Sequence, residues 1–129
     1  MGTVGTHCLL ELYECPVHLL DDPGFVEKAL INAAEQGLST LLKSVTHQFH
    51  PYGVTAVGLL AESHIAIHTW PEHRYVGADT FTCGERANPE KACMYLVRTF
   101  EAVKYDLRQV QRGTGIKAPV GPAAAMGSR

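Results

Sequence analysis

The sequence predicts an α+β protein, a two-layer α/β sandwich in which a mainly antiparallel sheet carries two helices on one face. Short segments with strand-like alternation are separated by turn signals. Two further segments repeat apolar residues at helical spacing behind N-cap signals. The order β-α-β-β-β-β-α-β joins neighbouring strands by hairpins, which favours an antiparallel sheet with its helices on one side.

Six segments have the character of strands. Residues 54–61 (VTAVGLLA) are rich in β-branched and apolar side chains, and residues 75–83 (YVGADTFTC) alternate. A turn signal at Pro51-Tyr52-Gly53 precedes residues 54–61, and another at Pro71-Glu72-His73-Arg74 follows the strand 63–70. The predicted strands cover residues 6–14, 38–49, 54–61, 63–70, 75–83 and 105–111.

Two helices are predicted between these strands. Asp21-Asp22-Pro23 begins the first helix, with an acidic cap and proline in the first turn, and Gly37 ends it. Asn88-Pro89-Glu90 begins the second helix in the same way. The apolar faces consist of Phe25, Val26, Ala29, Leu30 and Ala33 in the first helix, and of Ala92, Tyr95, Leu96, Thr99, Phe100 and Val103 in the second.

Composition limits the class of protein. A chain of 129 residues suits one domain, which we place at residues 1–112, and its 46% of hydrophobic residues can fill a core. Residues 113–129 are rich in Gly, Pro and Ala without periodicity, so we expect a flexible tail. The net charge of −2 and the absence of basic runs argue against nucleic acid or a membrane surface as a partner.

The chain has the features of a cytoplasmic protein. No apolar run approaches the roughly 20 residues of a membrane span, and the N-terminus lacks the basic region and cleavage site of a signal peptide. The four cysteines form no CxxC pair, so we expect them to be reduced and predict no zinc ribbon.

Histidine pairs do not predict a metal site. His64 and His68 share a face of one predicted strand but stand about 13 Å apart at ~3.3 Å per residue. Zinc needs its ligands at ~2 Å from one point. His47 and His50 point to opposite faces if the chain is extended there, so we predict no metal ligands.

Ser63 and His68 do not form a nucleophile–base pair within one strand. Their five-residue separation spans roughly 16 Å and places the side chains on opposite faces. They can cooperate only if the chain bends or if His68 meets a Ser63 of another subunit. Taken singly, Ser63, His68 and Cys83 are each more typical of structural residues in a sheet than of catalysts, and the GxSxG motif is absent.

In combination these residues resemble a known family. The stretches AESHIAIHTWPE (61–72) and ADTFTCGE (78–85), together with GTHCLLELYEC (5–15) and HQFHPYGVTAVGLLAESH (47–64), are similar in order and spacing to the short prokaryotic, pyruvoyl-dependent S-adenosylmethionine decarboxylases. The similarity runs from about residue 5 to residue 104.

The resemblance implies self-processing between Glu62 and Ser63, which gives chains 1–62 and 63–129. Ser63 would become a covalent pyruvoyl group that forms a Schiff base with the substrate amine and accepts the electrons released with CO2. The family assigns proton transfer during processing to the position of His68, and a supporting hydroxyl to that of Thr55, where serine is usual. It assigns reprotonation of the substrate carbon to the position of Cys83.

The resemblance also implies a substrate site. The position of Phe49 stacks on adenine, and that of Glu72 binds the ribose hydroxyls. Trp70 is a candidate wall of the pocket, and Glu11 matches an acid in the family's first strand. The product would be the aminopropyl donor for spermidine synthesis.

One departure leaves the substrate open. The family usually has Tyr-Gly after WPE, whereas this chain has His73-Arg74. Arg74 is either a solvated turn residue or a mark of a changed substrate, such as arginine or ornithine, decarboxylated by the same pyruvoyl chemistry. The presence of Phe49 and Glu72 favours the nucleoside. The alternative of another class is a binding module on this scaffold that is never processed.

The separation of Ser63 from His68 predicts assembly. The family's sites lie between two protomers and use residues from both, so we expect a symmetric homodimer with two shared sites.

Overall fold

The computed structural model describes residues 3–116, and its centre is one antiparallel sheet. The sheet has six strands in the order β2-β3-β4-β5-β1-β6, and each neighbouring pair is antiparallel. This arrangement confirms the predicted fold class. The strands are β1 (Gly5–Tyr13), β2 (Leu41–Gln48), β3 (Val54–Leu60), β4 (Ser63–Trp70), β5 (Tyr75–Thr82) and β6 (Lys104–Arg112).

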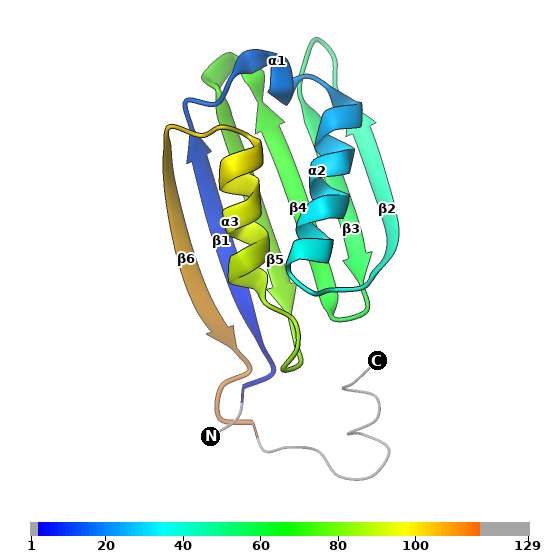
Figure 1. Ribbon diagram of the computed structural model, residues 1–129, viewed down its shortest axis with the longest axis vertical. Coiled ribbons are helices and arrows are strands. Elements are labelled where there is room, and N and C mark those ends of the chain that lie inside the picture. The colour runs from blue at the N-terminus through cyan, green and yellow to red at the C-terminus, as the bar shows by residue number, and fades with distance from the viewer. Residues whose placement is uncertain (1–2, 117–129) are drawn as a thin grey trace.

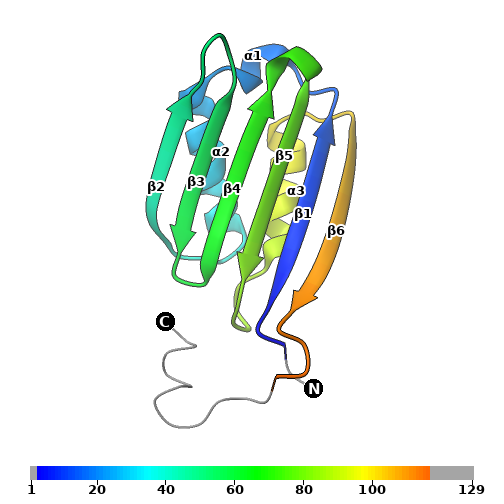
Figure 2. The ribbon, with the colours of Figure 1, turned by 180° about the vertical axis from the view of Figure 1, so that it is seen from behind.

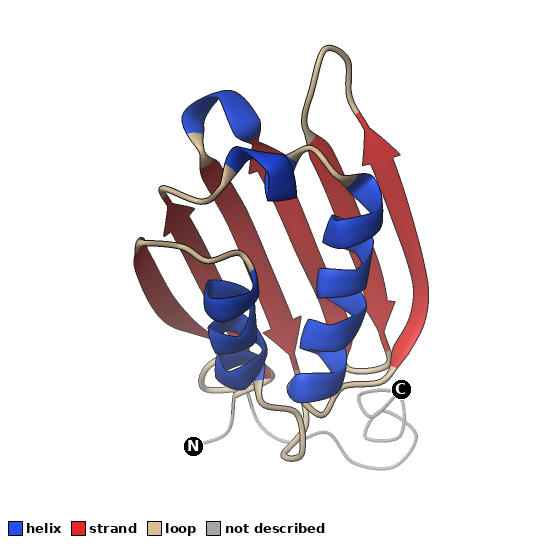
Figure 3. Cartoon of the chain, turned by 45° about the horizontal axis from the view of Figure 1, so that its top comes forward, coloured by secondary structure: helices blue, strands red, loops and turns tan. Residues whose placement is uncertain are grey.

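Two helices cover one face of the sheet and leave the other face open. Helices α2 (Pro23–Gln36) and α3 (Pro89–Thr99) lie side by side on this face and run roughly along the strands (Figures 1 and 3). The reverse view shows the uncovered strands (Figure 2). Because successive strand residues point to opposite faces, each strand contributes one set of side chains to the helix layer and one to the open face.

Both helices begin at the cap residues that the sequence predicts. The Asp22 side chain accepts a hydrogen bond from the Phe25 N–H at 3.1 Å, and the Asn88 side chain accepts one from the Lys91 N–H at 3.0 Å. At the end of α2, Gly37 lies so close to α3 that an added Cβ would stand 2.9 Å from the Ala92 Cβ. Glycine at this position therefore lets the two helices meet.

The core lies between the helices and the covered face of the sheet. Its members are apolar side chains of alternate strand positions and of the inner helix faces, almost all of them fully buried. The largest are Phe100, Leu10, Leu12, Leu20, Leu30, Leu60, Ile65, Ile67 and Leu96. Burial also raises the pKa of the Cys15 thiol to about 11.

Some boundaries differ from the prediction. Strand β2 begins at Leu41 rather than 38, because the chain leaves α2 through Leu38, whose φ is +59°. The second helix ends at Thr99, so the prediction that Val103 belongs to its apolar face was wrong. Val103 is exposed in the connection to β6, where its N–H donates to the Tyr13 carbonyl at 3.1 Å.

Two short helical segments had no counterpart in the prediction. They are α1 (Val17–Leu20) and the 3-10 turn η1 (Pro71–His73), both at the end of the sheet where β4 finishes. Within residues 3–116 no helix has the length and apolarity to cross a bilayer. Most of the expected tail, residues 117–129, lies outside the described residues.

Candidate active site

The turn between β3 and β4 presents one peptide carbonyl to two donors. The Glu62 carbonyl oxygen accepts hydrogen bonds from the Cys83 N–H and from the Cys83 thiol, each at 3.0 Å. The Glu62 side chain in turn accepts from the Thr40 N–H at 3.0 Å. A carbonyl held by two donors is polarised, and charge that developed on its oxygen would be stabilised.

Ser63 follows this carbonyl in an unusual backbone conformation. Its φ is +156°, which non-glycine residues rarely adopt. It is the first residue of β4 and pairs with Leu60 on β3 and Thr82 on β5. We call Glu62, Ser63 and Cys83 the turn cluster. Strained residues of this kind gather at functional sites, which makes the turn cluster a candidate for chemistry.

A second cluster lies on the open face, towards the end of the sheet opposite the turn between β3 and β4. Thr55 and His68 are directly opposite on β3 and β4, and the Thr55 Oγ1 lies 3.0 Å from the His68 Nδ1. In the same row across the sheet, Glu11 on β1 accepts a hydrogen bond from the Tyr75 hydroxyl. Burial and this bond to Glu11 raise the pKa of Tyr75 above its usual range. We call Thr55, His68, Glu11 and Tyr75 the distal cluster.

Aromatic rings extend the distal cluster. The ring of Trp70 lies 5.4 Å from that of Tyr75 and 6.3 Å from that of His68, centroid to centroid. Trp70 is partly exposed, so it forms a wall that a ligand could contact. Phe49, just after β2, is also exposed and packs edge-on against His47 at 4.6 Å.

Glu72 lines a cavity at the end of the sheet where β4 finishes. It belongs to η1, and the cavity has a volume of about 430 Å³. The lining residues are Val17, Asp21, Tyr52, Pro71, Glu72 and Arg74. An exposed carboxylate at the wall of such a cavity can accept hydrogen bonds from two hydroxyls of one ligand.

Arg74 also lines this cavity, but its guanidinium holds the protein's own backbone. Its Nε donates to the Cys15 carbonyl at 3.0 Å and its Nη2 to the Glu14 carbonyl at 3.3 Å. The residue is itself in the left-handed conformation, with φ +52°. These bonds fasten η1 to the end of β1, which is a different role from the solvated turn residue considered from the sequence.

The loop that carries Phe49 is fixed from the helix layer. The Asp21 Oδ1 accepts from the Gly53 N–H at 2.9 Å and from the Gln48 side chain at 3.2 Å. Gly53 has φ +111°, and a Cβ there would lie 3.2 Å from the Thr69 carbonyl oxygen. The exposed ring of Phe49 therefore sits on a braced loop.

The two clusters do not meet within one chain. Ser63 and His68 lie on one continuous strand, β4, and at about 3.3 Å per residue they are roughly 16 Å apart. His64, Ala66, His68 and Trp70 point to the open face, opposite the buried Ile65 and Ile67. The structure thus brings Cys83 to Ser63, and Thr55 to His68, but leaves the two pairs separate.

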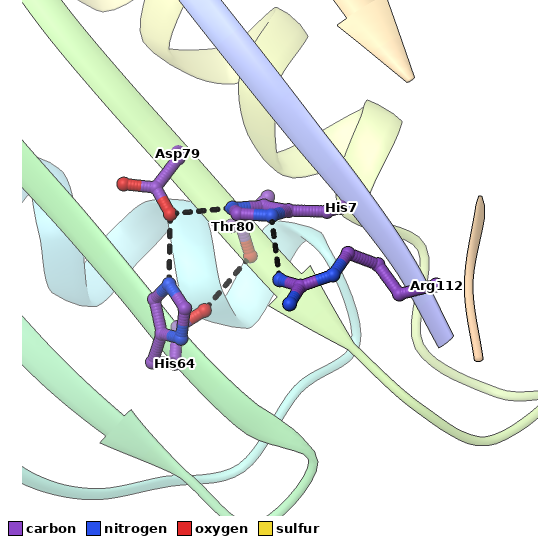
Figure 4. A network of polar contacts seen from close by, with 5 residues as sticks. All are labelled: His7, His64, Asp79, Thr80 and Arg112. Carbon is purple, nitrogen blue, oxygen red and sulfur yellow. Dashed lines mark hydrogen bonds and ion pairs between the residues drawn. The ribbon is translucent and has the colours of Figure 1, made fainter. Parts of the chain in front are cut away.

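Figure 4 shows a further polar network on the open face, which we call the carboxylate network. The Asp79 Oδ2 on β5 lies 2.7 Å from the Nε2 of His64 on β4 and 2.7 Å from the Nε2 of His7 on β1. The Arg112 Nη1 on β6 lies 3.3 Å from the Nδ1 of His7. Four side chains from four strands thus form one chain of hydrogen bonds.

The donor and acceptor roles in the carboxylate network follow from its ends. A carboxylate can only accept and a guanidinium can only donate. Both Nε2 atoms therefore carry protons that they donate to Asp79, and the Nδ1 of His7 accepts from Arg112. His7, His64 and Asp79 are also the one set among residues 3–116 whose ligand atoms, all within 4.8 Å, could hold a metal ion. A metal would have to displace both protons and sit beside the Arg112 cation, so hydrogen bonding describes this cluster better.

Sequence reasoning did not find the carboxylate network. It treated His64 only as a partner of His68 on the same strand, and it did not single out Asp79 or His7. His7, Phe81 and His64 occupy one row across β1, β5 and β4. Only the order and register of the strands reveal that neighbourhood, and periodicity along one strand carries no such information.

Comparisons with known proteins agree with one another. The model of the S-adenosylmethionine decarboxylase family matches residues 6–113. The S-adenosylmethionine decarboxylase proenzyme of Synechococcus sp. (strain WH7803) is 50% identical over 111 residues, which are 86% of this chain and 87% of that protein. The proenzyme of Methanococcus aeolicus is 43% identical over 117 residues, 91% of this chain and 100% of that protein.

A solved structure shares the fold. The crystal structure of the adenosylmethionine decarboxylase from Aquifex aeolicus VF5 superposes with a TM-score of 0.85 at 32% identity. The match covers 94% of this chain and 99% of that one. Sequence and fold therefore point to the same relatives.

Proposed function

Because this chain belongs to the S-adenosylmethionine decarboxylase family, we propose that it cleaves itself between Glu62 and Ser63 and then decarboxylates S-adenosylmethionine. The product would be the aminopropyl donor for spermidine synthesis. The observation that carries the proposal is the Glu62 carbonyl, which precedes a strained serine and accepts two hydrogen bonds from Cys83. That is the arrangement which attack on this carbonyl requires.

The proposed cleavage begins with the Ser63 hydroxyl. Its Oγ attacks the Glu62 carbonyl carbon, and the negative charge on the carbonyl oxygen is stabilised by the Cys83 N–H and thiol. The Glu62–Ser63 C–N bond then breaks as the nitrogen takes up a proton, which leaves an ester and a free amine. Loss of the Ser63 Cα proton expels the Glu62 carboxylate, and water hydrolyses the dehydroalanine to a ketone with release of ammonia.

Ser63 would then be the site of a covalent pyruvoyl group at the head of β4, held between β3 and β5. When formed, this group supplies an electron sink for the loss of CO2 from the substrate amine. The residues beside it fit such a group: the position is at a strand end, and Cys83 places a partly buried thiol at its side. Cys83 is the proposed proton donor to the substrate carbon.

Substrate recognition is assigned to the other end of the open face. Phe49 offers an exposed ring to the adenine, and the Glu72 carboxylate can accept from both vicinal hydroxyls of a ribose. Trp70 and Tyr75 provide aromatic surfaces that favour a sulfonium cation. Arginine and ornithine have no ribose for the Glu72 carboxylate to bind. Arg74 already donates to the backbone carbonyls of Glu14 and Cys15, so it does not favour these amino acids as substrates.

We further propose that two protomers share each site. A two-fold axis in the plane of the open face, running across the strands near Ala66, would place the turn cluster of one protomer against the distal cluster of the other. His68 of the partner could then take the proton from Ser63, oriented by its bond to Thr55. Exposed apolar side chains on this face, Val45, Val57 and Leu59, support its burial in a dimer.

The test of the proposed function combines mass and activity. Intact mass of the purified protein should give two chains, 1–62 and 63–129, the second with a ketone in place of the serine amine. The protein should release CO2 from S-adenosylmethionine and not from arginine or ornithine. A Ser63→Ala variant should remain one chain and be inactive. A wild-type chain that stays whole would favour an unprocessed binding module instead.

A further inference from the structure

Cleavage would remove two attachments of residue 63. The peptide bond to Glu62 is broken, and the nitrogen of Ser63, which belongs to the strand ladder, leaves as ammonia. Residue 63 then keeps its covalent bond to His64 and its place opposite Leu60 and Thr82 in the sheet. Chain ends with few attachments lose order, so the position of the new terminus depends on how His64 is held.

We infer that the carboxylate network fixes His64 and thereby positions the pyruvoyl group formed at residue 63, an inference that rests on the proposed function. Besides its backbone pairing with Phe81, His64 has two hydrogen bonds to side chains of β5. Its ring Nε2 donates to Asp79 at 2.7 Å, and its main-chain carbonyl accepts from the Thr80 Oγ1 at 3.3 Å (Figure 4). Both bonds act on the residue directly bonded to the reactive position.

Asp79 is itself held by the other members of the network. It accepts from His7 at 2.7 Å, and His7 accepts from Arg112, whose guanidinium also lies over the Phe81 ring at 5.2 Å from the centroid. A carboxylate that receives two short hydrogen bonds loses much of its rotational freedom. The support for His64 therefore extends across β5, β1 and β6.

The network also joins the two chains that cleavage would create. His7 lies on β1, in residues 1–62, whereas His64, Asp79 and Arg112 lie in residues 63–129. Backbone ladders also join the two chains, at β1–β5, β1–β6 and β3–β4, where Leu59 pairs with His64. The His7–Asp79 bond adds a side-chain link from residues 1–62 to the carboxylate that holds the His64 ring.

The inference predicts which kinetic constant depends on the network. A misplacement of the reacting group by about 1 Å can cost on the order of 100-fold in rate. The proposed substrate contacts, Phe49 and Glu72, lie outside the network, in the connections that follow β2 and β4. Loss of the network should therefore lower kcat and leave KM nearly unchanged.

The structural readout is hydrogen exchange at the start of β4. In the cleaved protein, Asp79→Ala should speed exchange at Ile65 and its neighbours by about tenfold, because local opening is no longer resisted. In the uncleavable Ser63→Ala background, where the bond to Glu62 persists, the same change should matter about twofold or less. Equal effects in the two backgrounds would overturn the inference.

The kinetic readout uses a graded series. Asp79→Ala should cleave to completion and lose about 10- to 100-fold in kcat, with KM within about threefold of wild type. Asp79→Asn keeps an oxygen that can accept from both rings, so its kcat should lie between those of Asp79→Ala and the wild type. Asp79→Ala and His64→Phe both remove the same His64–Asp79 hydrogen bond. The double variant should therefore lose no more kcat than the worse of the two single variants.

Controls separate this inference from the proposed function. Glu14→Gln breaks an exposed ion pair with Lys104 (3.4 Å) and should leave kcat unchanged. Failure of the wild type to cleave would overturn both proposals. Normal wild-type activity with unchanged kcat in Asp79→Ala, or failure of that variant to cleave, would overturn the positioning role alone. Should Asp79→Ala not fold, His7→Gln carries the same expectation with a smaller loss.

Discussion

The two faces of the sheet are built from the same strands and differ in every other respect. The covered face carries fully buried side chains such as Leu10, Ile65 and Val76. The open face carries hydrogen-bonded pairs, a carboxylate among histidines and several exposed apolar side chains. Neighbouring residues of one strand therefore point to different faces, one set into the core and the next towards the candidate site residues. Changes on the covered face should alter unfolding, and changes on the open face should alter cleavage and turnover.

Among changes on the open face, the largest effect should come from His68. His68→Ala removes the proposed proton-transfer group and should slow cleavage by about 10²- to 10⁴-fold. The unfolding midpoint should change little, because the ring is on the open face. The fraction of cleaved chain against time, read by intact mass, measures the effect. Normal cleavage in this variant would remove His68 from the processing step.

Cys83 should have the next largest effect. Cys83→Ala removes one of the two donors to the Glu62 carbonyl, and loss of one such donor costs about 10²- to 10³-fold in rate. The backbone N–H of residue 83 remains as the second donor. Cys83→Ser keeps a side-chain donor and should recover most of the cleavage rate. Equal rates for the serine and alanine variants would show that the thiol does not assist this step.

Glu72 tests recognition apart from cleavage. Glu72→Gln weakens the acceptor for the ribose hydroxyls and should raise KM about 10- to 100-fold, since hydrogen bonds to a charged group contribute roughly 1.5–3 kcal/mol. Cleavage and kcat should be nearly unchanged. Glu35→Gln, a matched change near the end of α2, should leave KM as it is. A fall in cleavage with unchanged KM would contradict the assignment.

On the covered side, ionisation of the buried Cys15 thiol should make the free energy of unfolding depend on pH. The Cys15 thiol has a pKa raised from 9.0 to about 11, so the folded state keeps its proton while the unfolded state loses it. Stability should therefore be full below about pH 9 and fall by about 2 kcal/mol as pH rises to 11. Denaturant titrations of wild type and Cys15→Ala measure this fall, which the variant should lack. A fall of the same size in the variant would assign it to other groups.

The fold was largely predictable because its signals are local. Alternation along strands, the caps at Asp22 and Asn88, and the turn at Gly53 each depend on neighbours in sequence, and the structure confirms all of them. Val103 was misassigned because helical spacing continued past the point where Glu101 adopts φ +54° and the chain turns towards β6.

The site was predictable only in part because its contacts cross strands. Motif resemblance points to Ser63, Cys83 and His68 as candidates, and the alternation of side chains along β4 is enough to separate Ser63 from His68. The bonds from Cys83 to the Glu62 carbonyl, from Tyr75 to Glu11 and from His64 to Asp79 depend on strand register. Partners on different strands, 15 to 64 positions apart in the sequence, produce no periodic pattern from which the contact could be predicted.

Co-assembly of two variants tests most directly whether one site uses two protomers. Ser63→Ala and His68→Ala, distinguished by mass tags, are expected to remain essentially uncleaved as separate homodimers. In the mixed dimer, the intact Ser63 of one chain would face the intact His68 of the other. The prediction is that the His68→Ala chain is cleaved and one active site forms per mixed dimer. If both chains stay whole in the mixed dimer, each protomer depends on its own His68 and the shared site is contradicted.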